Sequence, residues 1–169
     1  MDIFKKCFEF SAVRDAKASG YYPYFLPLDS NEGTEVVYHG RRIIMCGSNN
    51  YLGLTTHPRI KQAAIDAIKK YGTSCTGSRF LNGNMTIIED LEHDLADWVG
   101  KESALIFSTG MQVNLGAISA LVGRGDTIIM DKDDHASIYD GARLSHGKIE
   151  RYEHNDIAHL ERVLQRLPE

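Results

Sequence analysis

The chain has 169 residues, of which 43% are hydrophobic and 25% charged, and it carries a formal net charge of −4. These values are typical of a globular chain long enough to build one core, and the negative charge, with no run of Lys and Arg, argues against nucleic acid as a main partner. No apolar stretch reaches the roughly 18 residues that a membrane span needs, and the N-terminus lacks the apolar core of a signal peptide. We therefore expect no transmembrane segment and a cytoplasmic protein.

The three cysteines, Cys7, Cys46 and Cys75, are widely spaced and form no C-x-x-C pair. An odd number of cysteines at such separations supports neither a disulfide framework nor a zinc site. We expect reduced thiols without a catalytic role, and no bound metal.

The first 55 residues predict an N-terminal arm followed by a small β-hairpin. Residues 35–38 and 42–46 alternate apolar and polar side chains around a short glycine-containing turn, which predicts the hairpin. Residues 20–27 contain two prolines and predict an extended connector. At the start of the chain, helical spacing indicates a helix that packs on its own protein or on a partner subunit, with a membrane surface as the alternative. Its apolar stripe consists of Ile3, Phe4, Cys7, Phe8 and Ala12.

A loop, a helix and a second loop follow the hairpin. The first loop, GSNNYLGL at residues 47–54, contains Asn50, whose amide either donates to a carboxylate or satisfies its own backbone. Pro58 at an early helical position and Gly72 at the end mark the helix. The second loop has several glycines and a single arginine, Arg79, and indicates either a mobile connection or the lining of a pocket.

The next helix, residues 86–99, begins with the capping-box pattern Thr86-x-x-Glu89 and ends at Gly100. Its charged residues, Glu92 among them, are interpreted as a solvated face. The helix therefore receives a structural role only.

Residues 104–140 hold the pattern most closely tied to chemistry. The short apolar run at residues 104–107 predicts a buried parallel strand. Gly110 begins a helix that is apolar nearly all round through residue 122, so it should be buried on most sides. A second strand is predicted at residues 127–130. Strand, helix and strand make a βαβ unit, and the ligands of such sheets lie beyond the carboxyl ends of the strands.

The turn into this helix has the properties of an anion site. Gly110 allows the backbone to approach closely, and the first free N–H groups and the helix dipole point outward, so a phosphate would fit there. The second strand leads to His135 at the same rim, and a flat aromatic ring that carries a phosphate could lie between them. The alternative is that Gly110 is an ordinary turn glycine and His135 an N-terminal helix residue.

The last part of the chain predicts a short helix over residues 137–145, a strand over 148–152 and a helix capped by Asn155. A sheet that ended here would have an open edge and a large uncovered face. We therefore expect an α/β fold that is part of something larger.

Four motifs, in this order and at these separations, carry a resemblance to a known family: SNNYLGL (residues 48–54), GTSCTGSRFLNG (72–83), LIFSTGMQVNLG (105–116) and DKDDHASIYDG (131–141). Together they resemble the α-oxoamine synthases. These are pyridoxal-phosphate enzymes of the aspartate-aminotransferase fold, which condense an amino acid with an acyl-CoA and lose CO2.

The resemblance implies the N-terminal portion of a fold-type I pyridoxal-phosphate-dependent transferase, incomplete in this chain. Its major domain would be a parallel sheet with helices on both faces. Residues 1–55 would form the arm and hairpin, and residues 56–169 the first part of the major domain.

The resemblance also implies roles for particular residues. The amides of Gly110 and Met111 would hold the phosphate of pyridoxal 5'-phosphate. Met111 stands where many members have Phe or Tyr, a change that a backbone contact tolerates. His135 would be the catalytic histidine, which stacks on the pyridine ring and hydrogen-bonds the substrate carboxylate or the acyl thioester oxygen. Asn50 would help to bind the amino-acid carboxylate.

Ser78 and Arg79 would border the active site of the partner subunit, because the family forms its site between the two subunits of a homodimer. The family's Schiff-base lysine, its ring-nitrogen aspartate, a second histidine and a carboxylate-binding arginine would follow residue 169. Lys132 is no substitute, because the family's lysine lies on a distant loop. We therefore expect this chain alone to be inactive.

Within the family, YYPYF, TEVV and GSRFLNG are most similar to the bacterial members that join serine to palmitoyl-CoA and form 3-ketosphinganine. Members that make 8-amino-7-oxononanoate, or that transfer an acetyl group to glycine, are the alternatives. The non-enzyme alternative is an inactive homologue that dimerises with a complete chain. The presence of His135 argues against it, since a decayed site has no reason to keep the ring.

Overall fold

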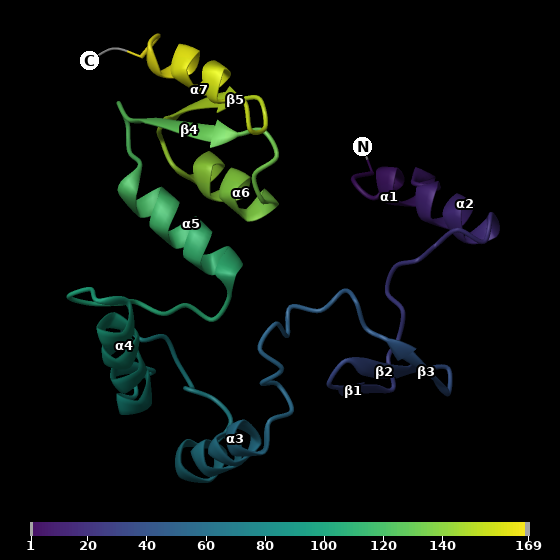
Figure 1. Ribbon diagram of the computed structural model, residues 1–169. Coiled ribbons are helices and arrows are strands. Elements are labelled where there is room, and N and C mark those ends of the chain that lie inside the picture. The colour runs from purple at the N-terminus through teal and green to yellow at the C-terminus, as the bar shows by residue number, and fades with distance from the viewer. Residues whose placement is uncertain (1, 168–169) are drawn as a thin grey trace. The chain divides into compact units, whose positions relative to one another are not determined.

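The computed structural model describes residues 2–167 and forms two compact units, Met1–Cys75 and Thr76–Glu169 (Figure 1). The predicted division of the sequence between residues 55 and 56 stays a prediction. Within residues 2–167, no helix combines the length and the apolar character that crossing a membrane requires.

The first unit contains, in order, α1 (Lys5–Glu9), α2 (Ala12–Ala18), β1 (Ser30–Glu32), β2 (Glu35–Tyr38), β3 (Arg41–Ile44) and α3 (Pro58–Tyr71). The strands form an antiparallel sheet in the order β1-β2-β3, with Val36 opposite Ile43. β2 and β3 are the predicted hairpin, whereas β1 was not predicted. His39 and Gly40 join them with φ of 48° and 72°, the positive values that suit a tight hairpin turn.

α3 follows the signals expected of its sequence. Pro58 lies in the first turn, and the His57 side chain accepts a hydrogen bond from the N–H of Arg59. Gly72, with φ of 81°, ends the helix as predicted. The N-terminal arm forms the two short helices α1 and α2, and the large side chains of its apolar stripe are exposed.

The second unit contains, in order, α4 (Thr86–Val99), α5 (Gly110–Leu121), β4 (Thr127–Asp131), α6 (Ala136–Leu144), β5 (Lys148–Tyr152) and α7 (Ile157–Leu164). β4 and β5 pair in parallel and are connected through α6, which confirms the α/β class. Figure 1 shows α6 and α7 on opposite sides of this pair, in agreement with helices on both faces. The most buried apolar residues of this unit, each at most 5% exposed, are Ala96, Met130, Ala142 and Val163.

Residues 104–107, predicted as a buried strand, have no partner strand within residues 2–167 and belong to neither a helix nor a strand. The apolar sequence indicates only a tendency to form a strand, because the ladder needs a neighbouring backbone. In place of a ladder bond, the N–H of Ile106 donates to the carboxylate of Glu92 on α4 at 2.8 Å.

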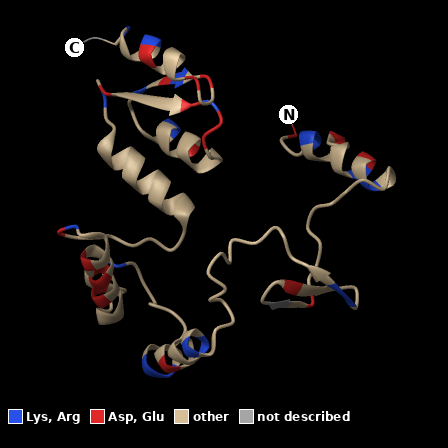
Figure 2. Cartoon of the chain, in the orientation of Figure 1, with Lys and Arg blue, Asp and Glu red and all other residues tan. Residues whose placement is uncertain are grey.

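α5 begins at Gly110 as predicted, but the expectation that it is buried on most sides is wrong for the described residues. None of its residues is buried, and Met111 and Leu121 are 52% and 82% exposed. Figure 2 shows no charged residue along the helix, which packs against α6. Its sequence indicates a buried helix, but the cover has to come from other elements.

Two helix caps differ from the predicted ones. Thr86 is the first residue of α4 and makes no capping hydrogen bond, so the predicted capping box is wrong. Glu89 instead accepts a hydrogen bond from the Asn84 side chain. Asn155 has φ of 56°, and Asp156 caps α7 by accepting a backbone N–H. Adjacent polar residues compete for the cap, and the pattern alone does not choose between them.

α5 and α6 approach each other closely at Gly141. A Cβ at this position would lie 2.6 Å from the carbonyl oxygen of Asn114 and 3.1 Å from Cδ1 of Ile118. The glycine therefore allows one turn of α6 to rest directly on the backbone of α5.

We expect Gly141→Ala to force these helices apart and to lower the free energy of unfolding by about 1–3 kcal/mol, the usual cost of overpacking. Gly123→Ala is the matched control, because a Cβ there would meet its nearest atom, Oδ2 of Asp126, at an ordinary 3.6 Å. Chemical denaturation followed by circular dichroism measures both variants. Equal stability of the two would contradict close packing of α5 on α6.

Candidate functional site

The N-terminus of α5 presents two backbone N–H groups without an acceptor. Thr109 caps the helix, since its Oγ1 accepts from the N–H of Gln112 and its carbonyl from Val113, each at 3.1 Å. Within residues 2–167 nothing accepts from the N–H groups of Gly110 and Met111. The first turn holds no acidic residue, and a Cβ at Gly110 would meet no atom within 4 Å. This open helix end can hold an anion.

His135 is the N-cap of α6. Its Nδ1 accepts a hydrogen bond from the N–H of Ser137 at 3.2 Å and lies 2.7 Å from Oγ of the same serine. The residue is exposed, and its Nε2 has no partner within the described part of the chain. His135 is thus an N-terminal helix residue that also leaves one ring nitrogen free for a ligand.

Asn114 joins the two helix ends. Its Nδ2 donates to Oγ of Ser137 at 2.8 Å. One turn further along each helix, Gly141 on α6 lies close to Ile118 on α5. Because the contacts advance along both helices together, α5 and α6 run in the same direction. Their N-termini, and with them the three residues predicted to bind the cofactor, lie at the same end of the pair.

Asp131 holds the loop that leads from β4 to His135. Its carboxylate accepts from the N–H of Asp133 at 2.8 Å, from Nδ1 of His154 at 2.9 Å and from the N–H of Asn155 at 3.3 Å. The hydrogen bond from Asp133 is the main cause of the lowered pKa of Asp131, and the carboxylate in turn raises the pKa of His154. Asp131 thereby ties the loop after β4 to the loop after β5.

Arg79 is held by a two-point ion pair. Its Nη1 and Nη2 donate to the two carboxylate oxygens of Glu92 at 2.5 and 2.8 Å, and its Nε donates to Oδ1 of Asn84 at 2.9 Å. The carbonyl of Ser78 accepts from the N–H of Gly83 at 2.9 Å and closes the loop, while the Ser78 residue is exposed. The guanidinium thus shapes the loop, and Ser78 lies at its surface.

Glu92 is a residue whose role sequence reasoning missed. Its interpretation as part of a solvated face is wrong, because the side chain is 13% exposed and also accepts from the N–H of Ile106 at 2.8 Å. The hydrogen bond from Arg79, followed by that from Ile106, lowers the pKa of Glu92 from 4.5 to about 2. One carboxylate therefore connects the Arg79 loop to the segment that enters α5. No local pattern reveals a partner so far away in sequence.

Asn50 belongs to the first unit. Its Oδ1 accepts from the N–H of Thr55 at 3.3 Å, and its side-chain NH2 has no acceptor within residues 2–167. Each of the two interpretations of Asn50 from the sequence therefore applies to one end of its side-chain amide. The oxygen satisfies the local backbone, and the donors remain available for a ligand.

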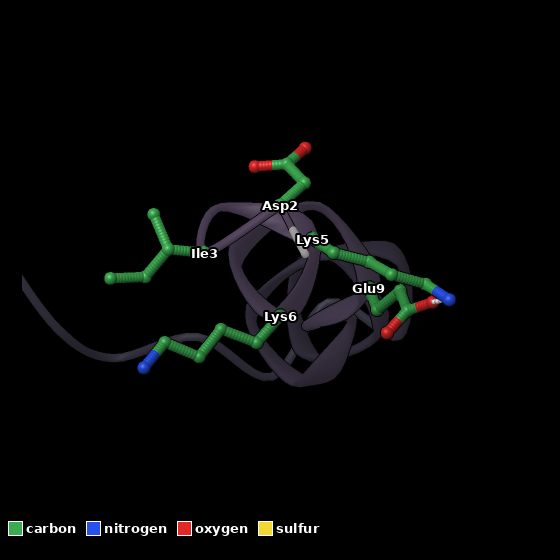
Figure 3. A pocket seen from close by; sticks show the side chains of 5 residues that line it. All are labelled: Asp2, Ile3, Lys5, Lys6 and Glu9. Carbon is green, nitrogen blue, oxygen red and sulfur yellow. Dashed lines mark ion pairs between the residues drawn. The ribbon is translucent and has the colours of Figure 1, made fainter.

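One surface hollow involves none of these residues. It has a volume of about 490 Å³ and sits on the N-terminal arm, where Lys5 pairs with Glu9 at 3.5 Å (Figure 3). It is lined by Asp2, Ile3, Lys5, Lys6 and Glu9, none of which is a predicted site residue. The candidate site at α5 and α6 rests on hydrogen-bond geometry and not on this hollow.

Comparisons with known proteins show which family the chain matches and how much of its relatives' length it covers. The family described as aminotransferase class I and II matches residues 41–169. A serine palmitoyltransferase of Sphingobacterium spiritivorum is 55% identical over 159 residues, which are 94% of this chain and 40% of that protein. An 8-amino-7-oxononanoate synthase of Thermoanaerobacter pseudethanolicus is 44% identical over 153 residues, 90% of this chain and 39% of that protein. The chain thus spans about 40% of the length of the curated relatives it matches.

Solved serine palmitoyltransferases share the fold over nearly the whole chain. The enzyme of Sphingomonas wittichii matches with a TM-score of 0.93 and 42% identity, and covers 99% of this chain and 43% of that one. The enzyme of S. paucimobilis, solved with PLP and myriocin bound, matches with a TM-score of 0.93 and 36% identity over 99% of this chain and 44% of that one.

The Arg79–Glu92 ion pair makes the free energy of unfolding depend on pH in the acid range. Because folding lowers the pKa of Glu92 from 4.5 to about 2, its stabilising contribution is present above pH 4.5 and is lost as the pH falls toward 2. We expect Glu92→Gln to be less stable than the parent at neutral pH and to lose less stability across this window. Urea denaturation at a series of pH values measures both quantities.

Glu161→Gln serves as the control, because Glu161 is exposed on α7 and its carboxylate has no partner within residues 2–167. This variant should keep the parent's pH profile. Parallel profiles for the parent and Glu92→Gln would show that Glu92 is solvated after all.

Proposed function

Because the chain belongs to the aminotransferase class I and II family, we propose that it is the N-terminal part of a pyridoxal-phosphate-dependent acyltransferase. The proposed reaction joins serine to palmitoyl-CoA and releases CO2 and CoA to give 3-ketosphinganine. The observation that carries this proposal is the shared end of α5 and α6, which offers two free amide N–H groups and an exposed imidazole. The identity of 55% to a serine palmitoyltransferase, against 44% to an oxononanoate synthase, supports these substrates.

The residues at this end fit pyridoxal 5'-phosphate. The N–H groups of Gly110 and Met111 would donate to the phosphate, and the missing side chain at Gly110 leaves room for it. His135 would lie against the pyridine ring, and such aromatic stacking contributes about 0.5–1.5 kcal/mol beyond area burial. When bound, the cofactor supplies the electron sink for negative charge at the α-carbon of the amino acid.

His135 is proposed as the catalytic residue because its free Nε2 can hold the substrate in place. An N–H on this nitrogen would donate to the serine carboxylate or to the thioester oxygen of the acyl-CoA. A positioned donor of this kind is worth on the order of 3 kcal/mol in the transition state.

Asn50, Ser78 and Arg79 are proposed to bind substrate in a cytoplasmic homodimer. The free NH2 of Asn50 would donate to the amino-acid carboxylate. The loop of Ser78 and Arg79 would border the partner subunit's active site. Glu92 supports the shape of this loop by pairing with the Arg79 guanidinium. Of Ser78 and Arg79, the exposed Ser78 is therefore the residue that is free to contact the partner subunit's site.

An 8-amino-7-oxononanoate synthase is the second candidate, because the identity to such an enzyme is 44% over 90% of the chain. The product distinguishes the two. Mass spectrometry of the full-length enzyme's reaction with serine and palmitoyl-CoA should detect 3-ketosphinganine. Absence of this product with fully loaded enzyme would remove the first candidate. The glycine acetyltransferase and the inactive dimerisation partner remain further alternatives, and the latter requires that no CoA be released with any amino acid.

The separate chain of 169 residues should be silent in the same assay. The family resemblance implies that the Schiff-base lysine lies outside these residues, and such an enzyme needs that lysine to hold the cofactor and to remove the α-proton. We expect no CoA release from serine and palmitoyl-CoA by this chain, with the full-length enzyme as the positive control. Turnover by the 169-residue chain would show that the Schiff-base lysine lies within these residues.

Substitutions of His135 in the full-length enzyme separate stacking from substrate positioning. Phenylalanine keeps a ring face but removes the N–H, so His135→Phe should retain most cofactor affinity while kcat/KM falls roughly a hundredfold. His135→Ala should lose both. Cofactor titration by absorbance and steady-state kinetics measure the two effects.

His146→Phe and His146→Ala are matched controls, because His146 is exposed and has no hydrogen-bond partner within residues 2–167. If His135→Phe abolished cofactor binding while the remaining holoenzyme turned over normally, His135 would be an anchor of the cofactor and not the group that orients substrate.

A further inference from the structure

We propose that Asn114 and Ser137 are positioning residues that fix His135 in the neutral tautomer with its proton on Nε2. The proposal rests on the proposed function for its catalytic consequence, but the tautomer itself follows from hydrogen bonds of this chain.

The backbone N–H of Ser137 can only donate, and it points to Nδ1 of His135 at 3.2 Å. Nδ1 must therefore carry a lone pair and no hydrogen. The hydroxyl of Ser137 lies 2.7 Å from the same nitrogen, so its O–H must donate there as well. With two donors directed at Nδ1, the proton of the neutral ring is on Nε2.

Asn114 sets the direction of the serine hydroxyl. Its Nδ2 donates to Oγ of Ser137 at 2.8 Å and occupies a lone pair of that oxygen. Because Nδ1 carries no hydrogen to offer, the hydroxyl hydrogen completes the contact to His135. The relay runs from an amide on α5 through a hydroxyl on α6 to the imidazole, where the hydroxyl and the N–H of Ser137 share the lone pair of Nδ1.

The surroundings of the relay restrict its geometry. Ser137 is 3% exposed, and Asn114 is half-buried on the side of α5 that faces α6. The hydroxyl therefore has no bulk water with which to exchange its partners. His135, in contrast, is exposed, and its Nε2 has no partner within the described residues.

The consequence for the proposed reaction is a donor of fixed polarity. An Nε2–H attracts a carboxylate or a thioester oxygen, whereas the opposite tautomer would present a lone pair to the same atom and repel it. Asn114 and Ser137 would thus influence substrate binding without touching the substrate.

The polarity of the relay can be reversed with one substitution of nearly the same shape. In Asn114→Asp, the carboxylate accepts the hydroxyl hydrogen of Ser137, so Oγ turns a lone pair toward Nδ1 and favours a hydrogen on that nitrogen. Gln112→Glu is the matched control, because it adds the same charge to the same end of α5 from a residue whose side chain makes no hydrogen bond within residues 2–167.

The experiment uses the full-length holoenzyme labelled with [15N]histidine, and the His135 signals are assigned by their loss in His135→Phe. The parent and Gln112→Glu should show an unprotonated Nδ1 and a protonated Nε2 by 15N chemical shift. Asn114→Asp should shift the balance toward a protonated Nδ1. The KM for serine should rise about tenfold relative to Gln112→Glu, with cofactor affinity matched between the two variants.

A parent enzyme with the proton of neutral His135 on Nδ1 would overturn the proposal, as would identical 15N shifts in Asn114→Asp and Gln112→Glu. If Asn114→Asp does not fold, Ser137→Ala takes its place. Loss of the hydroxyl leaves the backbone N–H of residue 137 as the one donor to Nδ1, so the tautomer protonated on Nε2 should lose population relative to the parent. An unchanged ring would count against the relay. A parent that releases no CoA with any amino acid would defeat the proposed function, while the 15N shifts would still decide the tautomer.

Discussion

The hydrogen bond from Asn114 to the buried hydroxyl of Ser137 is the contact on which the site depends. It joins α5 to α6 near their N-termini, at a place where Gly141 lets the two backbones come together. A helix N-terminus is an anion site only if something places it, and a histidine is useful only if its ring is aimed. This single contact links the free amides of Gly110 and Met111 to the exposed ring of His135.

Two carboxylates hold the segments that lead into these helices, and both do so by accepting backbone N–H groups. Asp131 gathers the loops after β4 and β5, and Glu92 holds the segment before α5 together with Arg79. Accepting hydrogen bonds favours the charged form: the bond from Arg79, followed by that from Ile106, lowers the pKa of Glu92, and the bond from the N–H of Asp133 is the main cause of the lowered pKa of Asp131. Polar contacts made by segments before and after α5 thus position the site, whereas α5 itself is mostly apolar.

Elements whose signals are local were predicted correctly from the sequence. Predictions failed where a feature depends on a neighbouring strand or a covering element. The hairpin at His39-Gly40, the start of α3 at Pro58 and the start of α5 at Gly110 each follow from residues within one turn. Residues 104–107 and the burial of α5 could not be derived, because a strand needs a neighbour and an apolar helix needs a cover. Among the site residues, Gly110 follows from helix-end physics, and the roles of Met111, Asn50 and His135 came from family resemblance. Asn114 carries the weak signal of an amide in an apolar helix, whereas Ser137 and Glu92 carry none.

The proposed function requires that the amides at the start of α5 and the ring at the start of α6 hold one cofactor between them. The most direct measurement is a crystal structure of the full-length protein with pyridoxal 5'-phosphate. We expect the phosphate within hydrogen-bond distance of the N–H groups of Gly110 and Met111, with the His135 ring parallel to the pyridine and its Nδ1 still against Ser137. A phosphate bound elsewhere, or a His135 ring turned away from the pyridine, would contradict it.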